Sequence, residues 1–133
     1  MNRSKEEIYK EMENNLGKVP QFFKTIPERV LALEWELFQK TQMEDSPISQ
    51  KNRQLIGLGI SAVKGCQYCT YFHTEFARFF GATNEEIEDA VHFAKDTAGW
   101  SSYVNGMQSD FEQFKADVKE VIKHVKEHQE MPV

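Results

Sequence analysis

The sequence predicts an all-α protein, one domain over residues 1–133 built as a compact bundle of about six to seven helices, and three observations carry this prediction. Serine or threonine stands three positions before glutamate ahead of several apolar runs, which is the spacing of a helix capping box. Apolar residues in those runs recur in steps of three and four, the period of one helix face. Glycines follow the runs where helices would end, while the 133 residues hold only 7 Gly and 4 Pro.

The first predicted helices are marked by their caps. Ser4 and Glu7 form a capping box for a helix from about Lys5 to Leu16, and Gly17 is its stop. A proline then opens a short helical turn over residues 20–23. The chain therefore begins with one full helix and one short one.

Two longer helices are predicted next. Pro27 fits the first position of a helix that fades near Met43, and residues 44–47 form a connector. Ser49 caps the following helix, which runs to Gly65. The apolar centre of that helix would also suit a short buried strand, so the segment has two interpretations.

The choice between helix and strand in this segment decides the fold. A strand, then Cys66 and Cys69 as a CxxC motif, then a helix is the thioredoxin arrangement, whereas a helix before the motif belongs to an all-α protein. The segment of about fifteen residues is too long for a typical strand. A thioredoxin-like fold also places a cis-proline loop from later in the chain beside the motif, and the only proline after Cys69 is Pro132. The helix is therefore favoured.

The second half of the chain starts with two more helices. One runs from about Cys66 to Phe80, with Gly81 as its stop, so the CxxC motif lies at the N-terminal end of a central helix. Thr83 and Glu86 form a capping box for the next helix, which reaches about Thr97.

The helical pattern is expected to break at Gly99 and Trp100. After a short irregular or helical stretch, Ser109 and Glu112 form a third capping box for a last helix to about Gln129. We expect the apolar seam of this helix to be either core or subunit contact. The seam is spaced in steps of three and four and consists of Phe111, Phe114, Val118, Val121 and Val125.

Composition and charge exclude several classes of function. The 21 acidic and 16 basic side chains give a net charge of −5, and such a field repels phosphate backbones and anionic lipid. The N-terminus lacks the apolar stretch of a signal peptide, and the longest mostly apolar run, residues 55–63, is less than half a membrane span. We therefore expect a cytoplasmic protein that binds neither nucleic acid nor a membrane.

Cys66, Cys69 and His73 carry the predicted chemistry. A structural disulfide would be kept reduced in the cytoplasm, so a cysteine pair two residues apart points to catalysis or metal binding. The three residues are spaced by three and four positions, which places them on one helix face. A helix N-terminus stabilises a thiolate, and a histidine one turn later accepts or returns a proton. We predict dithiol–disulfide exchange, with these three residues as the catalytic ones and no cofactor.

Structural and metal-binding interpretations of the same residues stay open. The cysteines would look the same as two small buried thiols that are neighbours by chance, and His73 as a hydrogen-bonded core residue. A zinc site made by these three residues lacks an obvious second ligand cluster. A second candidate metal site lies on the last helix, where a solvated charged face is the simpler interpretation: His124 and His128 with Glu120 and Glu127.

The segment 54–73, QLIGLGISAVKGCQYCTYFH, resembles the signature of the AhpD-like (alkylhydroperoxidase D-like) branch of the carboxymuconolactone decarboxylase family. In that branch a glutamate is followed by eleven residues, CxxC, three residues and a histidine. Cys66, Cys69 and His73 fall on this pattern without a gap, and the similarity spans roughly residues 46–100.

The resemblance implies an all-helical fold and assembly into homo-oligomers such as trimers or hexamers. It also implies peroxidase-linked thiol–disulfide activity in an antioxidant system. The corresponding partners are a peroxide or disulfide substrate and a thiol electron donor, such as a lipoylated or other redox protein.

The chain departs from the family pattern at Gln54, which occupies the position of the glutamate. Glutamine forms hydrogen bonds but takes up no proton at neutral pH. His73 would then act alone or through water, with Gln54 only orienting it, and without a carboxylate it would be less basic. Tyr68, between the cysteines, brings either a hydroxyl donor or a packing side chain. We therefore treat Gln54 and Tyr68 as supporting residues and expect slow or altered chemistry.

The family also includes decarboxylases that act on a lactone of aromatic catabolism and do not depend on a CxxC pair. The presence of both cysteines argues against that reaction here. The alternative to the oxidoreductase is therefore a non-catalytic or decarboxylase-like member of the same fold family.

Overall fold

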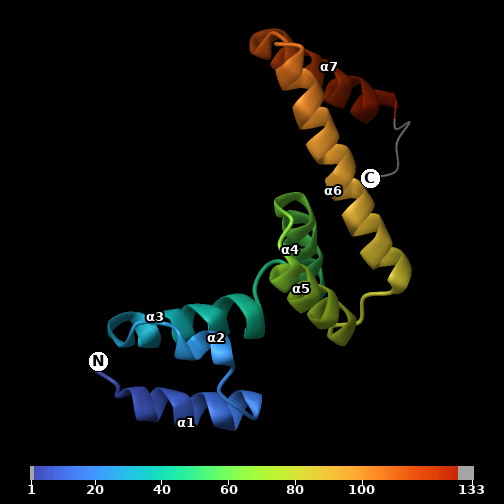
Figure 1. Ribbon diagram of the computed structural model, residues 1–133. Coiled ribbons are helices and arrows are strands. Elements are labelled where there is room, and N and C mark those ends of the chain that lie inside the picture. The colour runs from blue at the N-terminus through green and yellow to red at the C-terminus, as the bar shows by residue number, and fades with distance from the viewer. Residues whose placement is uncertain (1, 129–133) are drawn as a thin grey trace.

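The computed structural model describes residues 2–128, and every regular element in that part of the chain is helical (Figure 1). The prediction of an all-α fold is confirmed, and α4 runs through the segment for which a strand was the alternative. The elements are, in order, α1 (Lys5–Leu16), α2 (Gln21–Lys24), α3 (Glu28–Phe38), the π-helix η1 (Gln39–Met43), α4 (Gln50–Lys64), α5 (Gln67–Phe79), α6 (Asn84–Gly106) and α7 (Phe111–His128).

The predicted caps of three helices are confirmed. The Ser4 hydroxyl accepts a hydrogen bond from the N–H of Glu7 at 3.2 Å and begins α1. The Ser49 hydroxyl does the same for α4, accepting from the N–H of Asn52 at 3.1 Å. Thr83 begins α6 with a complete capping box. Each cap satisfies a backbone donor that the first turn of a helix leaves free, which is why local sequence located these starts.

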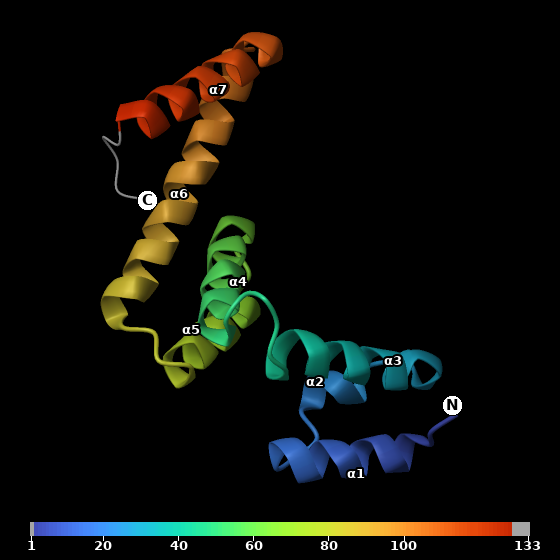
Figure 2. The same cartoon turned by 180° about the vertical axis from the view of Figure 1, so that it is seen from behind.

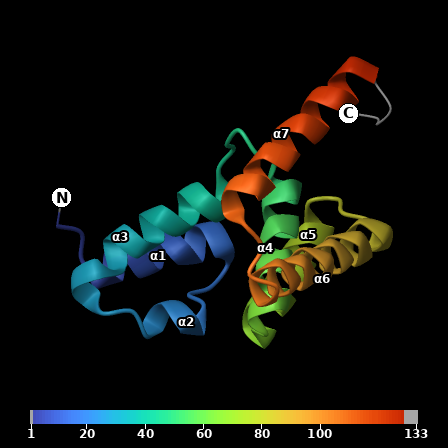
Figure 3. The same cartoon turned by 90° about the horizontal axis from the view of Figure 1, so that it is seen from above.

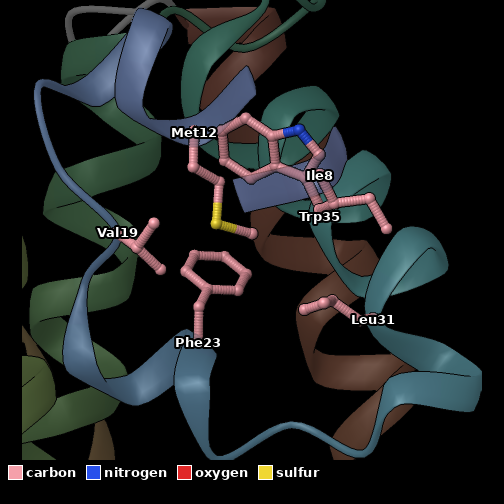
Figure 4. Packing of buried hydrophobic residues seen from close by; sticks show 6 residues of the cluster. All are labelled: Ile8, Met12, Val19, Phe23, Leu31 and Trp35. Carbon is pink, nitrogen blue, oxygen red and sulfur yellow. The ribbon is translucent and has the colours of Figure 1, made fainter. Parts of the chain in front are cut away.

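Helices α1, α2 and α3 form a closed unit with its own apolar core, shown in Figure 4. The Phe23 ring meets the Trp35 ring edge-on at 5.6 Å between centroids. Trp35 is fully buried, so this core excludes water completely at its centre. The six residues of the core are each 8% exposed or less: Ile8, Met12, Val19, Phe23, Leu31 and Trp35.

Phe38, at the end of α3, joins this unit to the rest of the molecule. Its ring packs against Phe23 at 5.1 Å and against Phe72 of α5 at 6.3 Å. The N-terminal unit thus lies directly against the helix that follows the CxxC motif.

The helix that begins after Pro27 ends in a way the sequence did not predict. Its last turn, η1, is a π-helix closed by a 2.9 Å hydrogen bond from the N–H of Glu44 to the carbonyl of Gln39. The guanidinium of Arg53, on α4, donates to the carbonyl of Thr41 at 2.6 Å and also to those of Lys40 and Glu44. Arg53 therefore satisfies carbonyls that the end of a helix leaves free, and it ties η1 to α4.

Two predictions for the C-terminal half were wrong. Helix α6 continues to Gly106 instead of stopping near Thr97, because an isolated Gly99 costs a helix only about 1 kcal/mol and no proline follows it there. The cap of α7 is Asp110, whose carboxylate accepts from the N–H of Gln113 at 3.0 Å, and not Ser109. The predicted end of this helix at Gln129 lies outside the described residues.

The second half of the chain is open. Figure 2 shows α1–α3 on one side of the α4–α5 pair and α6–α7 on the other, and Figure 3 shows α7 lying away from α5. Helices α6 and α7 have no buried residue. The chain exposes 10548 Å², whereas a compact monomer of this mass exposes about 7200 Å². A single copy therefore leaves much apolar helix surface uncovered.

None of the described helices combines the length and the apolarity that a membrane span requires.

Candidate active site

A tight reversal between α4 and α5 places the cysteine pair. Gly65 ends α4 in the left-handed conformation, with φ of 70°, a region that residues with a side chain rarely adopt. The N–H of Cys66 donates to the carbonyl of Ser61 at 3.1 Å, and Cys66 is already the N-cap of α5. The chain thus turns from one helix into the next with the first cysteine fixed at the new helix N-terminus.

The two cysteines differ in their electrostatic surroundings. The hydrogen bond from the thiol of Cys69, with a second from its backbone N–H at 3.3 Å, lowers the pKa of Cys66. The same side-chain interaction, together with a partial loss of hydration, raises the pKa of Cys69. Both are free cysteines, Cys66 half-buried and Cys69 exposed. The lower pKa of Cys66 and the higher pKa of Cys69 therefore favour Cys66 as the thiolate of the pair.

His73 lies one turn after Cys69, and its ring forms a hydrogen bond to a side chain of the preceding helix, α4. Its Nδ1 is 2.7 Å from Oε1 of Gln54, on α4. Burial lowers the pKa of His73, so the imidazole is neutral at neutral pH. Because Gln54 presents an oxygen, Nδ1 carries the proton and donates, which leaves Nε2 as an acceptor.

Gly57 makes room for this imidazole. A Cβ at Gly57 would lie 2.6 Å from the ring of His73, closer than atoms can approach. The sequence analysis assigned Gly57 no role. A glycine inside a helix destabilises it relative to alanine, so a close neighbour is the usual reason for one, and this was the available signal.

Gln54 is buried, with 2% of its surface exposed, and both ends of its amide are occupied. Its Nε2 donates to Oε1 of Gln42 at 2.9 Å, and Gln42 comes from η1. Sequence reasoning missed Gln42, because nothing in the local pattern predicts a π-helix or indicates which of its side chains faces α4.

A mostly aromatic pocket opens beside this arrangement. Its volume is about 830 Å³, and both Cys69 and His73 line it. Cys66 lines a neighbouring hollow of about 460 Å³ with more hydroxyl groups, so the pair lies between two cavities. The remaining lining of the aromatic pocket is Phe22, Phe38, Gln42, Gln67, Tyr68, Tyr71, Phe72, Glu75 and Phe76.

The structure brings together most of the residues singled out from the sequence. Cys66 contacts Cys69, and His73 contacts Gln54. Within the described residues, the His73 ring forms a hydrogen bond to Gln54 but none to the sulfur of Cys66 or Cys69. Tyr68 is 78% exposed at the pocket rim, where its side chain belongs to no core.

Metal binding gains no support from the geometry. Within residues 2–128, no three histidine, cysteine or acidic side chains gather as metal ligands. This applies to the CxxC motif with His73 and to the pair His124 and His128, whose rings stack at 4.1 Å between centroids.

The fold and site define an all-helical protein with a CxxC motif at a helix N-terminus and a buried histidine–glutamine contact beside it. The chain belongs to the carboxymuconolactone decarboxylase family, whose model matches residues 26–108. It is 29% identical over 90 residues to "Uncharacterized protein 4 in cox locus" of Paracoccus denitrificans, which covers 68% of this chain and 77% of that protein.

A solved structure shows the same fold. The crystal structure of the alkylhydroperoxidase AhpD core from Rhodospirillum rubrum superposes with a TM-score of 0.68 at 20% sequence identity. The superposition covers 77% of this chain and 79% of that one. The fold is therefore AhpD-like.

Proposed function

We propose that this protein is a thiol–disulfide oxidoreductase with peroxidase-linked, antioxidant activity of the alkylhydroperoxidase type. The observation that carries the proposal is the position of Cys66 at the N-terminus of α5, where its sulfur accepts a hydrogen bond from the backbone N–H of Cys69. Backbone donors and the helix dipole both favour a thiolate at this place. The AhpD-like fold and the family membership support the same class of activity.

With a disulfide substrate, RSSR, the Cys66 thiolate attacks one sulfur. A new S–S bond forms to Cys66, the RS–SR bond breaks, and RS⁻ leaves. Cys69 then passes its proton to Nε2 of His73 and attacks the Cys66 sulfur. The second RS⁻ leaves and takes the proton from the imidazolium. Two electrons have moved from the dithiol to the substrate, which departs as one thiol and one thiolate.

With a peroxide, ROOH, the Cys66 thiolate attacks the terminal oxygen. The S–O bond forms as the O–O bond breaks, and RO⁻ takes a proton from water, so Cys66 becomes a sulfenic acid. Cys69, deprotonated by His73, attacks that sulfur, and the hydroxide that leaves takes the proton back from the imidazolium as water. An external thiol donor returns the disulfide to the dithiol.

The aromatic pocket suits partners with an apolar body. It opens beside Cys69 and His73, so an alkyl or aromatic hydroperoxide, or the hydrocarbon arm of a lipoylated donor protein, would bury apolar surface there. A dithiol that must return to its reduced form also fits a reducing compartment, which supports a cytoplasmic location.

Gln54 favours one other candidate function, a scaffold that keeps the cysteines without turnover. A glutamine cannot take up the proton that the family glutamate accepts, and His73 makes no hydrogen bond to either sulfur among the described residues. In that case the aromatic pocket would bind a ligand without redox chemistry.

Alkylation kinetics distinguish the two candidates. In the reduced wild-type protein, we expect iodoacetamide at mildly acidic pH to alkylate Cys66 faster than free cysteine and Cys69 more slowly, with the modified residue located by mass spectrometry. The Cys66→Ser and Cys69→Ser variants each lack one of the two thiols. The wild-type protein should reduce a small disulfide or a peroxide, with lipoamide as an alternative disulfide, and both variants should lose turnover. If both thiols reacted at the rate of free cysteine and the wild type showed no turnover, the oxidoreductase would be excluded and the non-catalytic scaffold would be supported.

We also propose that the chain assembles into homo-oligomers, such as trimers or hexamers. Its exposed surface exceeds that of a compact monomer by about 3300 Å², while a standard interface takes about 800 Å² from each partner. An apolar groove of about 680 Å³ lies open between α4 and α6. The seam of α7 is exposed as well: Phe111, Phe114, Val118 and Val121.

Light scattering tests this assembly. We expect a mass of several chains at micromolar concentration, and a Val118→Glu variant should lower it, because the new charge would lie in an apolar contact. A wild-type monomer at that concentration would refute the proposal.

A further inference from the structure

His73 is connected to two side-chain amides by consecutive hydrogen bonds. Nδ1 of His73 donates to Oε1 of Gln54 over 2.7 Å, and Nε2 of Gln54 donates to Oε1 of Gln42 over 2.9 Å. Gln54 is buried, so water does not take the place of either partner. Gln42 is half-buried at the edge of the aromatic pocket.

An amide differs from a carboxylate in that its two ends are not equivalent. Either oxygen of a carboxylate accepts a proton donor, so a glutamate would hold Nδ1–H of His73 in any orientation. Gln54 does so only while its oxygen points at the ring. If Gln54 turned over with Gln42 unchanged, its oxygen would face the oxygen of Gln42, and a buried acceptor would lose its donor. The second amide therefore decides what the first presents to the histidine.

The backbone that carries Gln42 is itself held against α4. Arg53 precedes Gln54 in the chain, and its guanidinium donates to the carbonyls of Lys40 and Thr41 on η1 and to that of Glu44 just after it. The π-helix and the start of α4 are thus fastened together next to the two amides. π-Helical turns occur often at functional sites, where they place one side chain differently from an α-helix.

We propose that Gln42 is a positioning residue for His73. By accepting from Gln54, it keeps the oxygen of that amide toward the imidazole, so that Nδ1 holds the proton and Nε2 stays free to accept one. The part of the inference that concerns the proton of Cys69 rests on the proposed function, whereas the part that concerns the tautomer of His73 does not.

The tautomer is measured directly by long-range ¹H–¹⁵N correlation spectra of the full-length, reduced protein at alkaline pH, where the imidazole is neutral. The wild type should show Nδ1 protonated and Nε2 unprotonated in His73. A His73→Gln variant assigns the signals, and the exposed ring of His92 serves as an internal reference. A wild-type His73 protonated at Nε2 would overturn the inference without any mutation.

Two substitutions at position 42 test the cause. Gln42→Glu has only acceptor oxygens, so it enforces the observed direction of the chain and should keep the wild-type tautomer. Gln42→Met has a similar volume but no acceptor, so Gln54 is free to turn over and a mixture of tautomers should appear. If Gln42→Glu switched the tautomer, the native amide chain would run the opposite way and the proposal would be wrong.

The matched control is Gln39→Met, the same exchange on the same π-helix, because the side-chain hydrogen bonds of Gln54 among the described residues go to Gln42 and His73. It should leave the tautomer as in the wild type, whereas a mixture in both methionine variants would indicate a general loosening of η1 and refute a specific role for Gln42. Circular dichroism establishes that both variants are folded.

The reaction rate separates this inference from the proposed function. Closure of the Cys66–Cys69 disulfide should slow by about two- to tenfold in Gln42→Met, the worth of one neutral hydrogen bond, and recover in Gln42→Glu. A tautomer change in a protein without turnover would keep the positioning role and remove the oxidoreductase. If the protein turned over substrate but the tautomer of His73 stayed the same in every position-42 variant, the oxidoreductase would be supported and the positioning role of Gln42 would be refuted.

Discussion

The α1–α3 unit and the α6–α7 arm are both helical, yet they differ in what stabilises them. The first buries Trp35 and Leu31 completely within a single copy, while the second has no buried residue at all. Caps of the same kind begin helices in both regions. Local sequence therefore decides where helices form, and it does not decide whether their apolar faces are covered within one chain.

The largest expected effect breaks the closed region. Trp35→Ala removes a fully buried indole that packs against both Phe23 and Phe38 and should lower the free energy of unfolding by about 3–5 kcal/mol. Phe114→Ala, on the half-exposed seam of α7, should cost less than about 1 kcal/mol in a dilute sample but reduce the oligomeric mass. Urea unfolding and light scattering measure the two quantities, and equal stability losses would erase the distinction between the regions.

The next largest effect is expected where α4 packs against the His73 ring. Gly57→Ala places a methyl group 2.6 Å from the ring of His73, so the ring must move away from Gln54. Disulfide closure should slow by about tenfold or more, because misplaced reacting groups lose their orientation. Gly59→Ala is the control in the same helix, since its new Cβ meets Ala94 at an ordinary 3.4 Å. Equal rates in the two variants would show that the position of the His73 ring does not matter.

A smaller effect concerns charge at the same place. Gln54→Glu should raise the pKa of His73, because a carboxylate 2.7 Å from Nδ1 stabilises the imidazolium. Burial lowers the pKa of the native histidine, so the wild type should lose stability as the pH falls below the ordinary histidine value of 6.5. The variant should lose less over that range. NMR titration reports the pKa directly, and an unchanged value would exclude the contact.

The sign of the rate change in Gln54→Glu is also informative. A faster reaction near neutral pH would support proton transfer through His73, since the imidazole becomes a stronger base. A slower one would show that the new carboxylate acts mainly on a cysteine, whose pKa it would raise.

The smallest effect tests local structure in the open arm. Asp110→Ala removes the cap of α7 and should destabilise its first turn by about 1 kcal/mol, seen as faster amide exchange of Gln113. Asp110→Asn keeps an acceptor oxygen and should retain most of the protection. If the amide exchange of Gln113 became equally faster in both variants, the charge of Asp110, and not its hydrogen bond, would stabilise the start of the helix.

Much of the fold was predictable because its signals are local. Ser4, Ser49 and Thr83 begin helices where their hydroxyls were expected to cap them, and Gly17 and Gly65 end helices in the left-handed conformation. Helix α6 continues past its predicted end because Gly99 costs it only about 1 kcal/mol, which is too little to end a helix.

The geometry of the candidate site was predictable as far as its residues share one helix or a known spacing. Cys66, Cys69 and His73 follow from positions along the chain, and the contact between His73 and Gln54 agrees with the family pattern. Gln42 was not predictable, because its role depends on a π-helix and on tertiary packing between η1 and α4. The space at Gly57 is likewise a property of two helices and not of one.

The aromatic side chains between the N-terminal core and the pocket have a practical consequence for spectroscopy. The Trp35 indole stacks on Phe38 at 6.0 Å, and Phe38 lies 6.3 Å from Phe72, the neighbour of His73 in the chain. Phe38 lines the pocket, so a molecule that binds there should change the surroundings of the buried Trp35 indole. With Trp100 replaced by phenylalanine, Trp35 is the remaining tryptophan, so its emission should report whether the pocket is occupied.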